Sequence, residues 1–330
     1  MRILVTGGAG FIGSHVADRF VALGHEVAVF DDLSTGFREF VNPKARFYHA
    51  DLADADAVES CVAEFRPEIV DHHAAQIDVR QSVAEPRHDA KVNVLGSLGL
   101  LESCTRHRVR KFVYASTGGA IYGEGRVLPA TEEHPINPES PYGASKHTVE
   151  HYLYIWKLLH GLDHTVLRYP NVYGPRQNPH GEAGVNAIFI GLMMNGQRPR
   201  IFGSGEQVRD YLYVGDVVDA NQLALGRGSG AIVNLGRGVG VSVNDIFREL
   251  KALLSFEDDP IYEPPRPGEV QRIYLDASRA REVLGWESRV PFSEGLRRTV
   301  EWVRAQRENP DRAGRPVTES VAPRDANRPL

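Results

Sequence analysis

Short apolar runs that alternate with helical patterns fill the first 169 residues, and this alternation constrains the fold more than any other feature of the chain. The runs are rich in β-branched residues and almost continuously apolar, as expected for parallel strands buried on both faces. Alternating strands and helices are typical of an α/β fold, a doubly wound parallel sheet with helices on both sides. The predicted strands are 3–6, 25–30, 45–49, 68–72, 111–116 and 164–169, and the predicted helices are 11–23, 54–65, 86–107 and 141–160.

The pattern changes after residue 169. Residues 170–184 are rich in Pro, Gly, Asn and His, and they predict a loop. Further helices are predicted at 185–196, 213–226, 243–255, 277–284 and 293–307, with strands at 200–202 and 231–235. We expect residues 1–169 plus 211–236 to form the sheet domain, 170–210 plus 237–312 to form a smaller α/β lobe, and the polar tail 313–330 to be disordered.

Composition excludes several classes of protein. The 330 residues carry 38 Lys and Arg against 43 Asp and Glu, a net charge of −5, whereas nucleic-acid-binding proteins usually have a strongly basic face. The sequence contains no run of about 18 apolar residues, which is the length needed to span a membrane. The N-terminus lacks a signal-peptide pattern. The two cysteines, Cys61 and Cys104, cannot form a disulfide framework. We therefore expect a cytoplasmic protein.

A glycine-rich turn joins the first predicted strand to the first predicted helix. Gly7, Gly10 and Gly13 have the spacing at which a pyrophosphate can sit on a helix N-terminus, because a tight turn and close backbone approach both require residues without side chains. Asp31 ends the second predicted strand 18 positions after Gly13, where a carboxylate can bind the adenosine ribose hydroxyls. That carboxylate would repel a 2′-phosphate. The sequence therefore predicts a Rossmann-type domain that binds NAD rather than NADP.

A tyrosine and a lysine lie four residues apart at the start of the helix predicted at 141–160. Tyr142 and Lys146 therefore share one helix face. A tyrosine acts as a base near neutral pH only if its pKa falls by about 3 units, which corresponds to about 4 kcal/mol. An ammonium group about 6 Å away, together with an oxidised nicotinamide, could supply that stabilisation.

The strand predicted at 111–116 ends in two hydroxyl residues, Ser116 and Thr117, which are followed by Gly118 and Gly119. Ligands of doubly wound sheets bind beyond the carboxyl ends of the strands. Either hydroxyl could therefore hydrogen-bond the substrate oxygen whose proton Tyr142 removes, and the glycines leave the register between the two open.

These motifs together resemble the extended short-chain dehydrogenase/reductase family, and within it the bacterial UDP-glucose 4-epimerases. The resemblance covers residues 1 to about 305 and includes the segment 168–174, Arg-Tyr-Pro-Asn-Val-Tyr-Gly. It implies Thr117, Tyr142 and Lys146 as the catalytic residues. It also implies an isomerase that interconverts UDP-galactose and UDP-glucose through a 4-keto sugar, with NAD as a tightly bound prosthetic group.

The same resemblance assigns binding residues for both ligands. The implied cofactor contacts are Gly7, Gly10, Phe11, Ile12, Gly13, Asp31, Asp51, Leu52, Ala74, Asn93, Tyr142, Lys146 and Tyr169. The implied UDP-sugar contacts are Thr117, Asn171, Phe202, Gly203, Arg209, Arg266 and Glu269. Arginine side chains suit a diphosphate, and a carboxylate can accept hydrogen bonds from ribose hydroxyls.

Three positions depart from the family pattern. Ile77 replaces a lysine found near the nicotinamide in some members, and the hydroxyl loop carries one extra glycine. Ile273 aligns with a tyrosine that closes the sugar pocket, so N-acetylated sugars could also fit. UDP-glucuronate and UDP-N-acetylhexosamine epimerases are therefore alternatives. Gly118 and Gly119 stand where dehydratases carry an acid and a base, which argues against dehydration.

One further alternative concerns function, and two further expectations concern the oligomeric state and metal binding. A non-catalytic NAD-binding regulator would typically lose the tyrosine or the lysine, and this chain keeps both. The resemblance implies a homodimer through the helices predicted at 86–107 and 141–160. No metal site is predicted, because His72 and His73 lack cysteine or carboxylate companions at ligand spacing.

Overall fold

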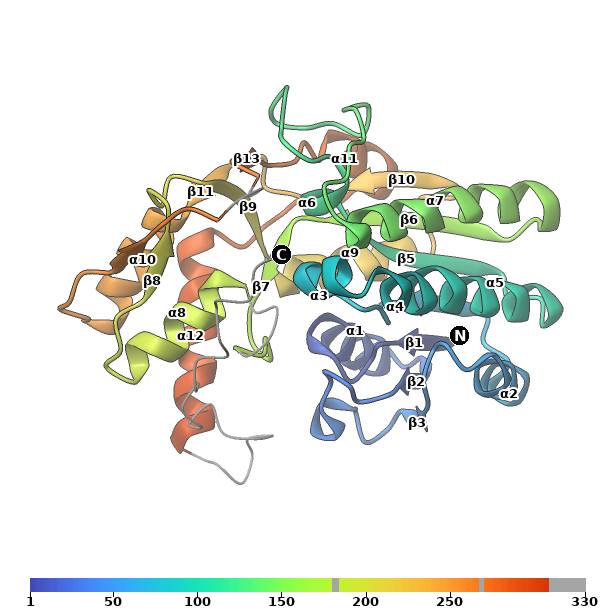
Figure 1. Ribbon diagram of the computed structural model, residues 1–330. Helices are drawn as coiled ribbons and strands as arrows, with labels where there is room; N and C mark the ends of the chain where they lie inside the picture. Colours follow the sequence, from blue (N-terminus) through green and yellow to red (C-terminus); the bar gives the residue numbers. More distant parts are fainter. Residues whose placement is uncertain (180–183, 267–269, 309–330) are drawn as a thin grey trace.

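A seven-stranded parallel sheet forms the larger part of the molecule (Figure 1). The computed structural model describes residues 1–179, 184–266 and 270–308. The strand order is β10-β6-β5-β4-β1-β2-β3, and every neighbouring pair is parallel. The strands are β1 (Arg2–Thr6), β2 (Glu26–Asp31), β3 (Arg46–His49), β4 (Ile69–His72), β5 (Lys111–Thr117), β6 (Asp163–Tyr169) and β10 (Ala231–Asn234). The predicted Rossmann-type fold is confirmed.

Helices cover both faces of this sheet, which explains why its strands are apolar throughout. One face packs on α1 (Phe11–Ala22), α9 (Val214–Ala224) and α11 (Ser278–Leu284). The other face packs on α2 (Ala55–Phe65), α5 (Ser97–Arg106) and α7 (Pro141–His160). The apolar surface buried on each side stabilises the sheet by about 25 cal/mol per Å².

The helix predicted at 86–107 is interrupted. It consists of α4 (Pro86–Ala90), a π-helical turn η2 (Lys91–Gly96) and α5, and the unpredicted helix α3 (Val79–Ala84) precedes it. Two other short elements, η1 (Arg38–Phe40) and α6 (Gly118–Ile121), follow strands of the sheet. Single π-helical turns often occur at functional sites, and this one carries Asn93.

A smaller lobe lies beside the carboxyl ends of the sheet strands, on the left in Figure 1. Its four-stranded sheet contains β11, β9 and β13, with β7 paired to β9, and its two-stranded sheet pairs β12 with β8. The strands are β7 (Asn171–Tyr173), β8 (Arg200–Phe202), β9 (Val208–Tyr213), β11 (Gly240–Ser242), β12 (Ile261–Glu263) and β13 (Arg272–Ile273). Helices α8 (Val185–Met194), α10 (Val243–Leu254) and α12 (Phe292–Glu308) enclose the core of this lobe.

Most strands of the smaller lobe were not predicted, and β7 lies within the predicted loop 170–184. Such strands are too short for a periodic signal, and their hydrogen-bond partners are distant in sequence. The predicted division between residues 210 and 211 falls inside β9, whereas α9 and β10 return to the large sheet. The tail 313–330 lies outside the described residues. None of the described helices combines the length and apolar character needed to cross a bilayer.

Candidate active site

Two glycines of the glycine-rich turn, Gly7 and Gly13, have no room for a side chain. Gly7 has a left-handed φ of +67°, and a Cβ atom there would lie 2.6 Å from the backbone nitrogen of Ala74. A Cβ atom on Gly13 would collide with the carbonyl oxygen of Gly7. Gly10 is the N-cap of α1, and no side chain caps that helix. The first N–H groups of α1 therefore point toward the space where a pyrophosphate could bind.

Asp31 is held beside this turn at the end of β2. Its two carboxylate oxygens accept hydrogen bonds from the backbone N–H groups of Ala9 (2.9 Å) and Leu33 (2.8 Å). Burial raises the pKa of Asp31, although these two hydrogen bonds oppose the effect. Phe11 and Ile12 open α1 and are half-buried, whereas Leu52 is buried and Asp51 is exposed. These residues form a cradle beside the turn that could hold an adenine dinucleotide.

Asn93 joins the end of β4 to α7. Its Oδ1 accepts from the N–H of Gln76 (2.8 Å), and its Nδ2 lies within hydrogen-bond distance of the Gln76 carbonyl and the Asp89 carboxylate. The Nδ2 group also lies 3.2 Å from the hydroxyl of Ser145 on α7. Asn93 therefore fixes the segment that contains Ala74 relative to the helix that carries Tyr142.

Tyr142 and Lys146 lie in the first turns of α7. Ser140 caps the helix by accepting from the N–H of Gly143, and Pro141 occupies its first turn, where no N–H donor is required. Tyr142 is half-buried, while Lys146 is only 3% exposed and lies 4.4 Å above the ring of Tyr114. Burial lowers the pKa of Lys146 to about 7, against the opposing effect of Glu150 and Asp89. The prediction treated this lysine as fully charged. Because its charged form is poorly solvated, Lys146 gives up its proton more readily than an ordinary lysine.

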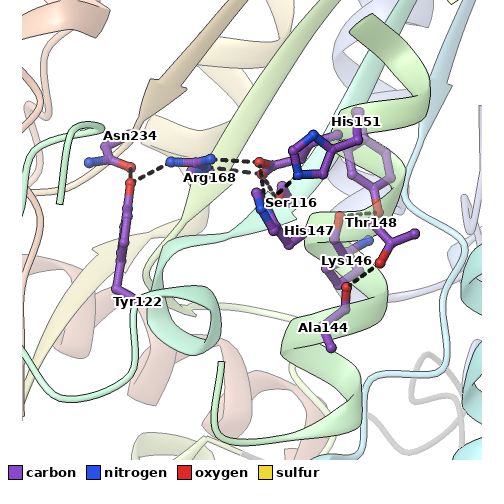
Figure 2. Close-up of polar contacts among 11 residues, drawn as sticks. Ser116, Tyr122, Ala144, Lys146, His147, Thr148, His151, Arg168 and Asn234 are labelled. Carbon is purple, nitrogen blue, oxygen red and sulfur yellow. Dashed lines mark hydrogen bonds and ion pairs between the residues drawn. The ribbon is translucent and has the colours of Figure 1, made fainter. Parts of the chain in front are cut away.

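Figure 2 shows that Ser116 belongs to a buried network that also contains Arg168 and Tyr122. The Ser116 hydroxyl donates to Oε1 of Glu150 (2.6 Å), and Arg168 binds both oxygens of the same carboxylate at 3.0 and 2.6 Å. Arg168 also donates to Tyr122, whose hydroxyl donates to Asn234. Burial alone would raise the pKa of Glu150, but the hydrogen bonds from His147, Arg168 and Ser116 lower it to about 2.

Thr117 lies one residue beyond Ser116, at the carboxyl end of β5, and is half-buried. A Cβ atom built on Gly119 would lie 3.8 Å from the Thr117 hydroxyl and 3.4 Å from Oδ1 of Asn171. These two polar groups therefore flank the same glycine. The engagement of Ser116 with Glu150 favours Thr117 as the hydroxyl that is available to a ligand.

Tyr169 is buried at the end of β6, and its hydroxyl is hydrogen-bonded to Asn221 on α9. His73 stacks on Tyr169 with ring centroids 6.2 Å apart, and its Nε2 lies 2.9 Å from the fully buried carboxylate of Asp71. His72 is engaged separately, by Thr6 at 2.7 Å and Ser97 at 3.0 Å. The sequence did not reveal the polar pair Asp71 and His73, although a carboxylate in the buried strand β4 and a histidine directly after that strand were a visible signal.

The residues predicted to bind UDP come from several elements of the smaller lobe. Phe202 and Gly203 line a cavity of about 360 Å³ together with Ser204, Gln207, Glu263, Pro265 and Gln271. The Arg266 guanidinium stacks 3.9 Å from the Phe202 ring centre. Arg209 donates to the carbonyl of Val208. The carboxylate of Asp210, the next residue in the chain, accepts from the backbone N–H groups of residues 237, 238 and 275. Glu269 lies outside the described residues.

Two residues around this lobe escaped the sequence prediction. Gln207 lines the cavity, and its amide donates to the carbonyl of Phe202 (3.0 Å). Asn186 in the first turn of α8 is buried, and neither atom of its amide has a hydrogen-bond partner among the described residues. An asparagine in an otherwise apolar helix was the signal that could have identified it.

The two other departures are placed differently. Ile77 is 49% exposed on the segment after β4, whereas Ile273 is buried in a cluster with Ile121, Tyr122 and Leu275.

The structure brings together the glycine turn, Asp31, Asn93, Thr117, Tyr142 and Lys146 at one edge of the large sheet. Phe202, Gly203 and Arg266 gather in the smaller lobe.

Comparisons with known proteins agree with this arrangement. A UDP-glucose 4-epimerase of Mycolicibacterium smegmatis is 46% identical over 310 residues, covering 92% of this chain and 99% of that protein. The structure of the Thermotoga maritima UDP-glucose 4-epimerase with UDP-glucose matches with a TM-score of 0.92 and 50% identity, covering 93% and 99% of the two chains. The Thermus thermophilus UDP-glucose 4-epimerase complex with NAD matches with a TM-score of 0.88 and 46% identity, covering 92% and 99%. Residues 3–236 also match the family model, so this chain belongs to the NAD dependent epimerase/dehydratase family.

Proposed function

We propose that this protein is an NAD-dependent isomerase that interconverts UDP-galactose and UDP-glucose. The observation that carries the proposal is the meeting of a dinucleotide cradle with Tyr142 and Lys146 at one sheet edge, with a separate cavity of about 360 Å³ in the smaller lobe. Relatives named UDP-glucose 4-epimerase that share almost half of the sequence over nearly the whole chain support the same reaction.

NAD would be held by the glycine turn and the N-terminus of α1 at its pyrophosphate, and by Asp31 at its adenosine ribose. Bound there, NAD supplies the chemistry of removing hydride from the sugar and returning it. Ala74 and Tyr169 lie at the carboxyl ends of β4 and β6, and Asn93 in η2 is hydrogen-bonded to Gln76 in the segment after β4. The nicotinamide half would extend toward these residues. Because the net redox change is zero, one bound NAD can serve many turnovers.

Tyr142 is the proposed base that takes the proton of the sugar 4-hydroxyl and later returns it. Its phenolate is stabilised by the ammonium form of Lys146, which lies one helical turn away on the same face of α7. Thr117 donates a hydrogen bond to the same sugar oxygen and fixes its orientation. The 4-keto sugar must present its opposite face before it is reduced, and this requires freedom around C4.

The smaller lobe would anchor the UDP portion while the sugar turns. Phe202 and Gly203 line the cavity that would take the uracil, and the exposed guanidinium of Arg266 stacks at its rim. Arg209 and Asn171 lie on the neighbouring strands β9 and β7. The Asn171 amide flanks Gly119 together with the Thr117 hydroxyl. Guanidinium groups bind diphosphates well because they are planar and permanently charged.

Related reactions remain as alternatives. Dehydration across C5 and C6 requires an acid and a base after the hydroxyl residue, and Gly118 and Gly119 provide neither. UDP-glucuronate and UDP-N-acetylhexosamine epimerisation would use the same three catalytic residues. Ile273 is buried in a cluster with Ile121, Tyr122 and Leu275 and is not among the residues that line the described cavity, so it does not decide between these alternatives.

We also propose a homodimer through α5, η2 and α7. The outward face of α7 carries Tyr154, Ile155, Leu158 and Leu159, and Leu158 is 71% exposed. Leu95 on η2 is 62% exposed. Exposed apolar residues at helical spacing typically mark an interface. Replacing Leu158 with lysine should shift the protein toward monomer in sedimentation experiments.

A cytoplasmic location is part of the proposal. Both cysteines are free and buried. Burial raises the pKa of Cys61 to about 12, so its thiol is unreactive. Buried, unpaired thiols of this kind suit a reducing compartment.

One experiment tests the function directly. The purified protein is denatured and the released nucleotide is identified, and native protein is then given UDP-galactose with no added cofactor. We expect NAD to be released and UDP-glucose to appear in the NMR spectrum. Parallel reactions with UDP-glucuronate and UDP-N-acetylglucosamine separate the alternatives. Failure to convert UDP-galactose while either of the others reacts would overturn the assignment.

A further inference from the structure

Two histidines on the outer side of α7 lie closer together than any role described above requires. His147 and His151 are one helical turn apart, their Nε2 atoms are separated by 3.0 Å, and their ring centroids by 4.5 Å. His151 is exposed and His147 is half-buried. In Figure 2 both rings lie at one end of the Glu150 network.

Glu150 determines which nitrogen of His147 carries hydrogen. The Glu150 carboxylate forms a buried ion pair with Arg168, which donates to both of its oxygens, so it can only accept. Nδ1 of His147, 3.1 Å from Oε2 of Glu150, is therefore the donor. A neutral His147 then presents the lone pair of Nε2 toward His151. Proteins orient imidazole ligands of metal ions in this way, with the second ring nitrogen donating to a carboxylate.

The distance between the two Nε2 atoms suits a chelated ion. Metal–imidazole bonds of about 2.0–2.1 Å across a 3.0 Å separation enclose an angle of about 90–100°. This angle is close to that of tetragonal and octahedral ions and smaller than the tetrahedral angle of structural zinc sites. We infer that His147 and His151 form a binding site for a divalent transition-metal ion with right-angle coordination, such as Ni²⁺ or Cu²⁺.

Binding requires no redox change. In the metal-free chain, His151 donates its Nε2 hydrogen to His147, and the ion takes that place once His151 carries its hydrogen on Nδ1 instead. Across residues 1–179, 184–266 and 270–308, no three His, Cys, Asp or Glu side chains converge as a metal-binding group. The chain itself therefore supplies two ligands, and either water or a second copy completes the site.

The position of the pair on α7 makes both sources of further ligands testable. His147 and His151 share a helix face with Tyr154 and Leu158, the exposed apolar residues of the proposed dimer surface. A dimer built on that surface would bring a second histidine pair to the same interface. This source depends on the proposed dimer, whereas completion by water does not.

The test uses full-length protein without a polyhistidine tag, with its retained nucleotide. Ni²⁺ and Cu²⁺ are titrated calorimetrically into wild type, His151→Gln and His160→Gln. The last is a matched control, because His160 is exposed on the same helix and has no histidine one turn away. Loss of a carboxylate partner alone typically costs about 10–100-fold in metal affinity, so His151→Gln, which removes a ligand, should weaken binding at least as much. The His160→Gln variant should bind as wild type does.

Cu²⁺ electron paramagnetic resonance provides a second readout, because coupling to two imidazole nitrogens should be seen in wild type and coupling to one in His151→Gln. One equivalent of metal per chain supports a site completed by water. Half an equivalent, with loss of binding in Leu158→Lys, supports a site shared by two copies. Wild-type binding that is absent, or unchanged in His151→Gln, overturns the inference.

Discussion

The cofactor end of the candidate active site consists mainly of backbone groups, whereas the catalytic end consists of side chains. At the cofactor end, the uncapped first N–H groups of α1 are available to a ligand, and Gly7 and Gly13 leave no space for side chains. At the catalytic end, buried side chains from four distant segments hold α7 in place, with Glu150 and Arg168 at the centre.

This difference predicts how each end fails. A backbone cradle is sensitive to volume, because an added methyl group collides with main-chain atoms that cannot move independently. A buried ionic network is sensitive to charge, because removal of one partner leaves the other unpaired in a medium of low dielectric constant. Substitutions at the two ends should therefore separate cofactor retention from folding stability.

The largest effect is expected from Tyr142→Phe, which removes the base and leaves the backbone cradle and the buried ionic network in place. General-base catalysis is typically worth about 10²–10⁴-fold, so kcat for UDP-galactose should fall by that range. The amount of nucleotide released on denaturation should equal that of wild type. Turnover at the wild-type rate would remove Tyr142 from the mechanism, and loss of the nucleotide would show that the two ends are not independent.

Arg168→Met tests the charged network. Glu150 would remain buried without its main partner, and the free energy of unfolding measured in urea should fall by about 3–5 kcal/mol. Adding Glu150→Gln to this variant should restore part of the loss. The ionised state of wild-type Glu150 contributes stability above its ordinary pKa of 4.5 that is lost as the pH falls through about 2. The free energy of unfolding of Arg168→Met should therefore change less than that of wild type as the pH falls.

Lys146→Met tests the cost of a single buried charge. The pKa of Lys146 is about 7 in the folded protein and 10.5 as the ordinary value, so the unfolded chain binds more protons between these two pH values. Wild-type stability should rise with pH across this window. The variant should be more stable than cofactor-free wild type by up to about 4 kcal/mol at pH 7, and this gain should vanish above pH 10.5. A gain that does not depend on pH would contradict the charge argument.

Gly13→Ala tests the backbone cradle. The new methyl group would contact the Gly7 carbonyl oxygen, and overpacking of this kind typically costs about 1–3 kcal/mol. Because the strain lies at the pyrophosphate site, nucleotide content should fall more than thermal stability. Gly161→Ala is a matched control for a glycine substitution, since nothing lies within 4 Å of a Cβ atom there. Its left-handed φ of +70° gives it a backbone cost without a contact.

The smallest effect separates the two hydroxyl residues. Ser116→Ala removes one hydrogen bond to Glu150 and should lower stability by about 1 kcal/mol, with little change in kcat. Thr117→Ala should do the reverse, lowering kcat while leaving unfolding in urea almost unchanged. The opposite pattern would make Ser116 the catalytic hydroxyl.

Several parts of the site could be predicted because their requirements are local. Gly7 to Gly13 and Asp31 belong to one strand–helix–strand unit, and Tyr142 and Lys146 to one helix, so spacing alone was sufficient. The partners of Ser116 could not be predicted, since Glu150 and Arg168 lie 34 and 52 positions away and Asn234 joins through Tyr122. The proton balance of Lys146 was also missed, because burial by Tyr114 is a property of packing.

The sequence by itself determined the parallel sheet, the order of its helices and the dinucleotide turn, because apolar periodicity and glycine spacing act over a few residues. Only the tertiary structure decided the short strands of the smaller lobe, the π-helical turn that carries Asn93, and which hydroxyl at the end of β5 remains free. These features depend on contacts between segments far apart in the chain, and the free energy of such contacts is settled only when the segments pack together.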